Sequence, residues 1–412
     1  MSPAGERVHS LDAVRALAMF LGIFLHASLP YSLPGFPWPI FDQSRSVGIT
    51  IVVFVIHAFR MPAFFLVAGF FARTLFVRIG FHGFVRHRLR RILLPLTVAW
   101  IAIFPLVRFA WAWGALSARP GSDALSVADV LRRAFSPPLL LAGLGFGHLW
   151  FLYYLLVIYG VFLAARALLL RLADPDGSLG PLLDRRIREL AGSGFELPAL
   201  ALPTTLLLLP MRSWGIDSPN ASLLPQARSV LLYLAFFAFG WMMSRQHGLL
   251  EVYASRWLRY GIVAVAAVCT QLPLLWMVTL PDRAAVAIWL RPLFFANYAV
   301  LCWAATLALI GSCARFLAHP NRLVRYAADA SYWMYLVHLP IVLLAGFVFA
   351  RVAWPWPLEL LLVHALVIPV LLGSYHTLVR FTWVGVLLNG RRVPRLRPAS
   401  PPTDTSPSGA ST

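Results

Sequence analysis

A histidine and an arginine lie inside the first long apolar stretch of the chain, LDAVRALAMFLGIFLHASLPY at residues 11 to 31. Arg15 and His26 are eleven residues apart. At about 100° per residue this spacing returns both side chains to one helix face, about 16 Å apart along the axis. A charge in lipid costs at least about 2.5 kcal/mol, so the face is expected to point into protein or a watery cavity. There, histidine can act as a general base, and arginine can bind an anion.

A purely structural interpretation of the same pair stays open. The arginine could extend along the helix to the lipid headgroups, and the histidine could be a hydrogen-bonded core residue. Asp12, in the first turn of the stretch, is favourable beside the positive end of a helix. Its carboxylate is also a candidate partner for a buried cation.

A second group of ionisable residues lies in VIHAFRMPAFFLVAGFFA. His57 and Arg60 are three residues apart and are therefore neighbours on one helix face. Arg60 lies too deep in the apolar stretch to reach the headgroups easily, so it needs a partner or an anion. Pro62 frees a backbone carbonyl nearby. The structural alternative is an internal ion pair, for which Asp12 is one of few available acids, or a bond to helix carbonyls.

A third group lies in ASYWMYLVHLPIVLL, where Ser331, Tyr335 and His338 follow the i, i+4, i+7 spacing of one helix stripe. Tyr332 flanks them. Three hydrogen-bonding side chains on one stripe are hard to satisfy against lipid, so the stripe is expected to face the protein interior.

The stretch GHLWFLYYLL adds His148 and Trp150 at the start of another apolar segment. Aromatic residues at such a position often form an interfacial belt. We prefer that interpretation for Tyr153 and Tyr154, whereas Trp150 is a candidate site residue together with His148.

The composition predicts an all-α polytopic membrane bundle to position these groups. Of 412 residues, 60% are hydrophobic and 12% charged, and the mean hydropathy is +0.75. A bilayer core needs about 20 apolar residues per helix. Ten segments are expected to span it, at about 11 to 31, 47 to 71, 92 to 113, 148 to 170, 197 to 211, 229 to 244, 259 to 280, 290 to 311, 331 to 350 and 358 to 380.

The fifth segment is the weakest, because it is short and contains three prolines. Keeping it as a span places most loop arginines on one side of the membrane, which the positive-inside rule assigns to the cytoplasm. The N- and C-termini are then both cytoplasmic. Residues 1–390 are expected to form the transmembrane domain, and the basic, Pro- and Ser-rich residues 391–412 a disordered cytoplasmic tail.

The formal charge of +19 does not indicate nucleic-acid binding, because the basic residues sit in short clusters between apolar runs. The lipid bilayer is the better partner for this charge. The sequence contains no HExxH, paired-cysteine, GxSxG or P-loop motif. No metal site is therefore expected, nor a bound cofactor.

Taken together and in order, these stretches, with FVRHRLRRILLPL between them, resemble the acyltransferase 3 family of multi-pass membrane acyltransferases. Within that family the chain is similar to the branch of the glucan biosynthesis protein C type. The resemblance covers nearly the whole chain to about residue 388. One departure is Ala68 before Gly69, where the family usually has serine.

The resemblance implies a membrane O-acyltransferase of the bacterial inner membrane. Such enzymes move an acyl group, typically acetyl or succinyl, from cytoplasmic acyl-CoA to a hydroxyl of an extracytoplasmic or lipid-linked carbohydrate. Arg15 and His26 match the motif pair of the family, and Arg88 and Arg91 match its basic stretch. The acyl group, the carbohydrate and the oligomeric state are left open.

A route for the donor follows from depth along the first helix. We expect the CoA head to bind the basic cluster of Arg73, Arg86, Arg88 and Arg91, with its pantetheine arm passing Arg15 and its thioester meeting His26. His338, Tyr335 and Arg60 would line the same cavity. The alternative from another class is a transporter or flippase of a polar glycan or glycolipid. Proton-coupled transporters usually carry intramembrane acids, and these segments hold almost none.

Overall fold

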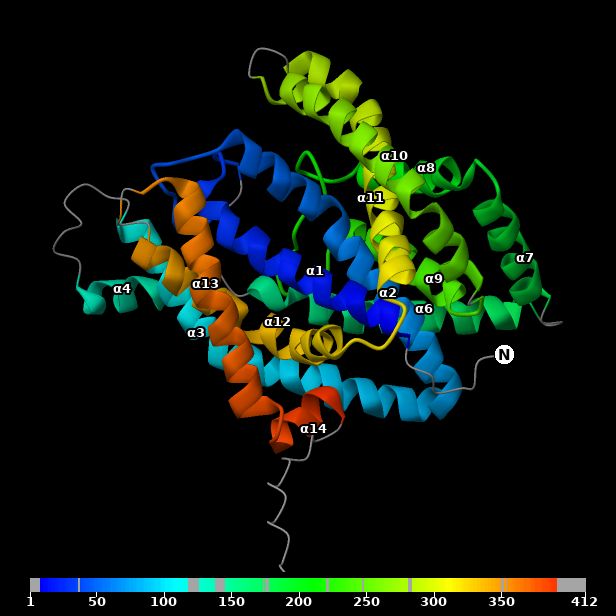
Figure 1. The fold of residues 1–412 in the computed structure, drawn as a ribbon, viewed down its shortest axis with the longest axis horizontal. Coiled ribbons are helices and arrows are strands. Elements are labelled where there is room, and N and C mark those ends of the chain that lie inside the picture. The colour runs from blue at the N-terminus through cyan, green and yellow to red at the C-terminus, as the bar shows by residue number, and fades with distance from the viewer. Residues whose placement is uncertain are drawn as a thin grey trace, which may run out of the picture.

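The computed structural model of the protein describes residues 8–35, 38–117, 126–137, 145–172, 174, 178–219, 222–246, 248–280, 284–349, 352 and 354–390. Over these residues the chain forms helices and no strand (Figure 1), so the predicted all-α class is confirmed. The tail at 391–412, for which the sequence predicts disorder, lies outside the described residues.

The helices follow one another along the chain. The first half contains α1 (His9–Ser28), α2 (Val47–Arg88), α3 (Leu94–Ser117), α4 (Val127–Ala134), α6 (Trp150–Leu172) and α7 (Leu179–Gly192). The second half contains α8 (Glu196–Leu208), α9 (Ala227–Met243), α10 (Gly248–Thr279), α11 (Ala284–Phe316), α12 (Arg322–Phe349), α13 (Trp356–Ser374) and α14 (Trp383–Asn389).

Several of these helices are long and apolar enough to cross a bilayer. Among the described residues there are 7 such helical runs, of which Val47–Ser117 contains two of the predicted segments because α2 continues into α3 through the turn Leu89–Leu93. The fifth and sixth predicted segments correspond to α8 and α9, which are apolar but shorter. The chain is a multi-pass membrane protein. The count of ten spans and the sides of the termini stay predictions.

The backbone of α2 changes direction at a glycine. Gly80 has φ 68° and ψ 179°, a conformation that side-chain-bearing residues rarely adopt. It separates the apolar part of α2 from its basic end, which leads to Arg91. At the other end, the side chain of Ser46 caps α2 by accepting from the Ile49 N–H. The apolar span and the basic segment therefore run in different directions.

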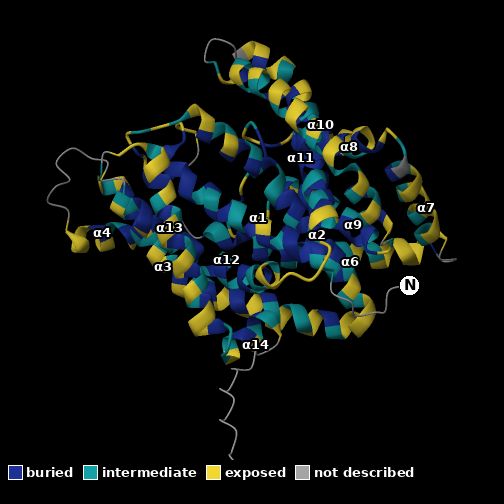
Figure 2. Cartoon of the chain, in the orientation of Figure 1, coloured by how far each residue is buried: buried dark blue, intermediate teal, exposed yellow. Residues whose placement is uncertain are grey.

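The centre of the bundle is formed by α1, which packs against α2, α11, α12 and α13. Buried residues concentrate on these helices, whereas the outer faces are exposed and largely apolar (Figure 2). Helices α2 and α9 approach closely through Gly69 and Gly240, because a Cβ at either glycine would collide with a carbonyl of the facing helix. This packing fixes one face of α2 against α9. Polar residues on another face of α2, His57 and Arg60, point into the interior.

Candidate active site

One cavity of about 780 Å³ runs through the bundle between α1, α2, α6 and α12, and its lining extends to α3 and the turn before α6. Every predicted site residue except Arg73 and Arg86 lines it. These lining residues are His26, Arg15, Asp12, His57, Arg60, Arg88, Arg91, His148, Trp150, Ser331, Tyr332, Tyr335 and His338.

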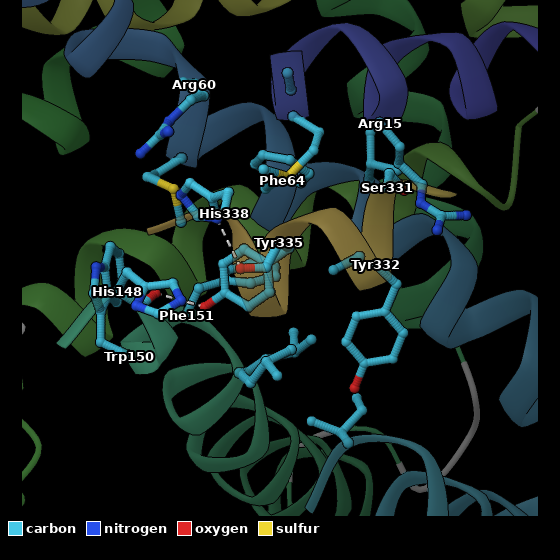
Figure 3. Close-up of a pocket in the computed structure, with 18 of the residues that line it drawn as sticks. Arg15, Arg60, Phe64, His148, Trp150, Phe151, Ser331, Tyr332, Tyr335 and His338 are labelled. Atoms are coloured by element: carbon cyan, nitrogen blue, oxygen red, sulfur yellow. Dashed lines mark hydrogen bonds between the residues drawn. The ribbon is translucent and has the colours of Figure 1, made fainter. Parts of the chain in front are cut away.

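Three imidazoles form a cluster at one end of the cavity, which we call the histidine end. The ring centroid of His338 lies 5.2 Å from that of His26 and 5.1 Å from that of His148. The three rings come from α1, α12 and the turn Gly147–Leu149, so only the tertiary fold unites them. In Figure 3 the labelled His338, His148 and Arg60 lie on one side of the cavity, and Arg15 and Tyr332 on the other.

Backbone carbonyls set the tautomer of His338, and the same holds for His148, described below. His338 directs Nδ1 at the carbonyls of Met334, 3.2 Å away, and Tyr335, 2.9 Å away. Because a carbonyl only accepts, Nδ1 carries the hydrogen and Nε2 is left as the acceptor. Among the described residues neither His338 Nε2 nor His26 Nδ1 has a hydrogen-bond partner. Both are nitrogens that could take a proton from a substrate.

A proline explains the orientation of His148. Pro340 lies inside α12 and has no N–H, so it cannot bond the carbonyl of Leu336 one turn earlier. That carbonyl instead accepts from Nε2 of His148 at 3.1 Å. The hydroxyl of Tyr335 donates to the His148 carbonyl at 2.6 Å, which fixes the turn from the other side. The sequence HLP of α12 thus aligns a histidine of another segment.

Residues of α2 complete the histidine end. His57 donates from Nε2 to the Ile216 carbonyl at 2.9 Å. The guanidinium of Arg60 lies against Gly22 of α1, where any Cβ would collide with it. Within the part of the chain that the structure describes, no carboxylate forms an ion pair with Arg60, and its Nε has no partner. Asp12, considered above as a possible counter-ion, instead pairs with Arg15 at 3.2 Å.

The opposite end of the cavity is basic, and we call it the arginine end. Its arginines are Arg15, Arg78, Arg88 and Arg91. The guanidinium of Arg88 is held over the ring of Phe84, 4.7 Å from the centroid. Such a surface, with arginines held by aromatic rings and carbonyls, suits the phosphates of a nucleotide-containing ligand.

Polar residues of α12 and α14 close the arginine end. Tyr332 donates its hydroxyl to the Arg91 carbonyl at 2.7 Å, and Arg91 donates from Nη1 to the Leu388 carbonyl at 3.4 Å. Ser331 donates its hydroxyl back to Ala328 of its own helix at 2.8 Å. All three residues of the predicted α12 stripe line the cavity, and the flanking Tyr332 lines its arginine end.

Two arginines of the predicted basic cluster do not line the cavity. Arg73 donates from Nη1 to the Ser244 carbonyl at 3.2 Å, at the end of α9. Arg86 is exposed. Arg86 lies two residues from Arg88 and is therefore about 200° around the helix from it. Arg73 lies before the break at Gly80, so the helix does not carry it to the face of Arg88. Residue type alone could not separate these arginines.

The sequence analysis missed several lining residues, including Arg78, Trp38, Trp111, Ser218 and Asn389. Arg78 stands two residues before Gly80, and a glycine inside this basic stretch is the sequence signal that could have indicated a change of direction there. Trp38 and Ser218 lie in connections between helices, where no periodicity indicates which way a side chain points.

This arrangement can support acyl transfer. It combines a basic end for an anionic ligand, an enclosed passage, and acceptor nitrogens of imidazole at the far end. Arg60 adds a positive charge beside His26, where a developing oxyanion would be stabilised. The roles of the individual residues stay predictions.

These features define a polytopic membrane protein with a polar cavity inside its bundle. Comparison with known proteins shows the family to which it belongs. The sequence profile of the acyltransferase domain family, acyltransferase 3, matches residues 8–376. The chain belongs to this family, which confirms the resemblance. No solved structure matches the chain.

Among curated proteins, the chain is similar to the glucans biosynthesis protein C of Escherichia coli strain SMS-3-5 / SECEC and of strain K12. Each match is 33% identical over 162 residues, which is 38% of this chain and 39% of the relative. The matched region thus spans well under half the length of these relatives.

Proposed function

We propose that the protein is an O-acyltransferase that moves an acetyl or succinyl group from acyl-CoA to a hydroxyl of a glucan or related carbohydrate. One observation carries the proposal: a single cavity connects a cluster of arginines to a cluster of histidines. Membership of the acyltransferase family supports the reaction class. The glucan acceptor is suggested by the name of the E. coli relatives.

The arginine end suits the donor. The phosphates of CoA carry several negative charges, and Arg88 and Arg91 present planar, permanently charged groups to the cavity. Arg15 lies farther in, on the α1 face that also carries His26, and eleven helical residues separate the two by about 16 Å. The extended pantetheine arm is the part of CoA that fits such a passage.

The histidine end suits the chemistry. A sugar hydroxyl is a weak nucleophile until a base removes its proton. In the proposed step the hydroxyl oxygen attacks the thioester carbonyl, and its proton passes to His26. The C–S bond then breaks, and the leaving CoA sulfur takes up the proton. Arg60 is placed to stabilise the negative charge on the carbonyl oxygen, or to bind the carboxylate of a succinyl group.

The membrane topology supports transfer across the bilayer. If the N-terminus is cytoplasmic, the arginine end faces the cytoplasm, where acyl-CoA is found, and His26 lies toward the outer side. The acceptor would then approach from outside. The proposal includes a location in the bacterial inner membrane, where cytoplasmic acyl-CoA could reach the arginine end.

The test uses membranes containing the protein, supplied with radiolabelled acetyl-CoA or succinyl-CoA and a mixture of glucose oligomers. Label on carbohydrate that depends on the protein, and that is lost in His26→Ala, is the expected result. A transporter or flippase would move the carbohydrate without labelling it. Absence of label from the wild-type protein with both donors would overturn the proposal.

A further inference from the structure

Trp38 stacks on His26 at the wall of the cavity. Its ring lies 5.7 Å from the His26 ring with an interplanar angle of 22°. The ring of Trp111, from α3, meets Trp38 edge-on at 6.4 Å and 73°. Both tryptophans line the cavity, and neither is explained by binding the CoA phosphates at the opposite end.

The backbone holds Trp38 in place. Gly114 of α3 lies against the Pro39 carbonyl, where a Cβ would collide, and a Cβ at Gly346 of α12 would lie 3.3 Å from Ile40. The Asp42 N–H then donates to the Pro30 carbonyl at 3.0 Å. The segment that carries Trp38 is therefore seated between α3 and α12 and tied to the end of α1, so the position of the indole beside His26 is built into the fold.

The indole of Trp38 carries an unused donor. The side chain is 9% exposed, and among the described residues its Nε1–H has no hydrogen-bond partner. Most buried N–H groups in proteins are paired, because an unpaired one costs about 1–3 kcal/mol. A donor left unpaired beside a reactive imidazole is readily explained if a ligand oxygen supplies its partner. The neighbouring His26 Nδ1 is likewise without a partner in the described chain.

We propose that Trp38 and Trp111 form the acceptor subsite, which binds one hexopyranose ring so that a ring hydroxyl faces His26. This inference rests on the proposed function, because it assumes a carbohydrate acceptor. A pyranose has an apolar C–H face, which packs on aromatic rings, and a rim of hydroxyls, which need hydrogen-bond partners. Trp111, half-buried, offers the apolar surface, and Trp38 offers both a ring and the donor.

The subsite explains how a hydroxyl would be aligned for transfer. Fixing one sugar oxygen on Trp38 Nε1 leaves a neighbouring hydroxyl to approach the imidazole that stacks on the same indole. The base then removes the proton from a held oxygen rather than from a freely rotating one. A water molecule has no apolar face to pack on the two rings. It would therefore be held less well than a sugar and would be a poorer acceptor of the acyl group.

The experiment compares Trp38→Phe, which keeps a ring but removes the N–H, with Trp111→Leu, which removes the aromatic surface. Kinetics are measured separately for the acceptor and for acyl-CoA. We expect each variant to raise the KM for glucose oligomers about tenfold, as expected for loss of one buried hydrogen bond or ring contact. The KM for acyl-CoA should change less than twofold. Trp289→Phe, on an exposed residue of α11, is the matched control and should change neither constant.

Calorimetric titration of the purified proteins with glucose oligomers gives a second reading that does not need turnover. Weaker binding in both variants, with wild-type binding in Trp289→Phe, supports the subsite. Unchanged acceptor KM and unchanged binding in Trp38→Phe and Trp111→Leu would overturn it, while label transfer by the wild-type protein would leave the proposed function standing. If the wild-type protein binds the oligomers at these tryptophans but transfers no label, the proposed function fails and the subsite stands.

Discussion

His26 of α1 and His338 of α12 face each other with ring centroids 5.2 Å apart, although 312 residues of sequence separate them. The hydrogen on His338 is held at Nδ1 by backbone carbonyls, so its Nε2 can only accept. His26 Nδ1 and His338 Nε2 both lack a partner among the described residues, so the two imidazoles could share the proton of a substrate hydroxyl. The packing of α1 against α12 is therefore what brings the two imidazoles together.

Removing the His26 imidazole is expected to abolish acyl transfer. Loss of a general base costs about 10²–10⁴ in rate, so kcat of His26→Ala should fall by at least about a hundredfold. Transfer of label from acyl-CoA to glucose oligomers measures this. The control is His364→Ala, because this histidine of α13 lies in the same bundle but does not line the cavity. Wild-type transfer by His26→Ala would remove this residue from the mechanism.

His338→Gln should lower kcat and leave the KM for acyl-CoA nearly unchanged. Glutamine cannot take up a proton at neutral pH, and the nitrogen at issue is an acceptor that no described residue satisfies. We expect a loss of about tenfold to a hundredfold, less than for His26, because His338 acts through its neighbour. Single-turnover measurements with labelled acyl-CoA separate this effect from binding. An increase in KM alone would instead assign His338 to donor binding.

Two arginines two residues apart should differ in their effect on the donor. Arg88 lines the cavity, whereas Arg86 is exposed and lies outside it. Arg88→Gln should raise the KM for acyl-CoA about tenfold, since one charge-assisted contact contributes about 1.5–3 kcal/mol, partly offset by solvent. Arg86→Gln should leave it within twofold. Steady-state kinetics at two salt concentrations decide the matter, and equal effects of the two substitutions would contradict the assignment.

Helical periodicity explains what could be predicted from the sequence. Arg15 and His26 recur on one face at a spacing any helix imposes, and both line the cavity. Periodicity cannot say which helix lies opposite, so the meeting of His26 with His338 was expected only through family resemblance. Arg73 and Arg86 show that residue type alone does not predict which side chains line the cavity. In a long helix broken at Gly80, residue type marked them as basic but not as facing the cavity.

Residues in connections were beyond this reasoning. Trp38 and Ser218 reach the cavity from segments between helices, where the position of a side chain depends on which neighbours leave room. Gly114 and Gly346 provide that room for Trp38, but their pairing with Pro39 and Ile40 is a tertiary contact. A glycine in a predicted span suggests close packing without naming the partner.

The connection between α8 and α9 should lose stability in acid. Burial raises the pKa of Asp217, but N–H donors from Arg212 and Ser213 and the charge of Arg228 outweigh it and lower the pKa below the ordinary value. A lowered pKa means that the carboxylate stabilises the fold above the unfolded value of about 3.9, and that this contribution is lost as pH falls through the lower folded value. Below both values Asp217→Asn should match the wild type.

Thermal unfolding in detergent, from neutral pH down to about pH 2, measures this contribution. At neutral pH Asp217→Asn should lower the free energy of unfolding by about 1–3 kcal/mol, because it weakens several hydrogen bonds to one charged group. Asp129→Asn, at an exposed carboxylate paired with exposed Arg132, should change it much less, because solvent screens an exposed ion pair. A pH-independent difference between wild type and Asp217→Asn would show that charge is not the cause.

A single methyl group at Gly22 should impair transfer by displacing Arg60. A Cβ there would collide with the guanidinium, which must then shift from its place beside α1. Gly22→Ala is expected to lower kcat about tenfold to a hundredfold, as does loss of one group that stabilises an oxyanion. Because alanine favours helix, any loss of folding stability should be small.

Gly160→Ala on α6 is the matched control for this prediction. No atom lies within 4 Å of a Cβ at that position, so transfer should be unchanged and the helix stabilised by about 0.5–1 kcal/mol. Comparing the two variants in the label-transfer assay and in thermal unfolding separates displacement of Arg60 from a general effect of removing glycine. If Gly22→Ala retains full kcat, the guanidinium has shifted without effect on the reaction, and the prediction that Gly22 fixes its working position is wrong.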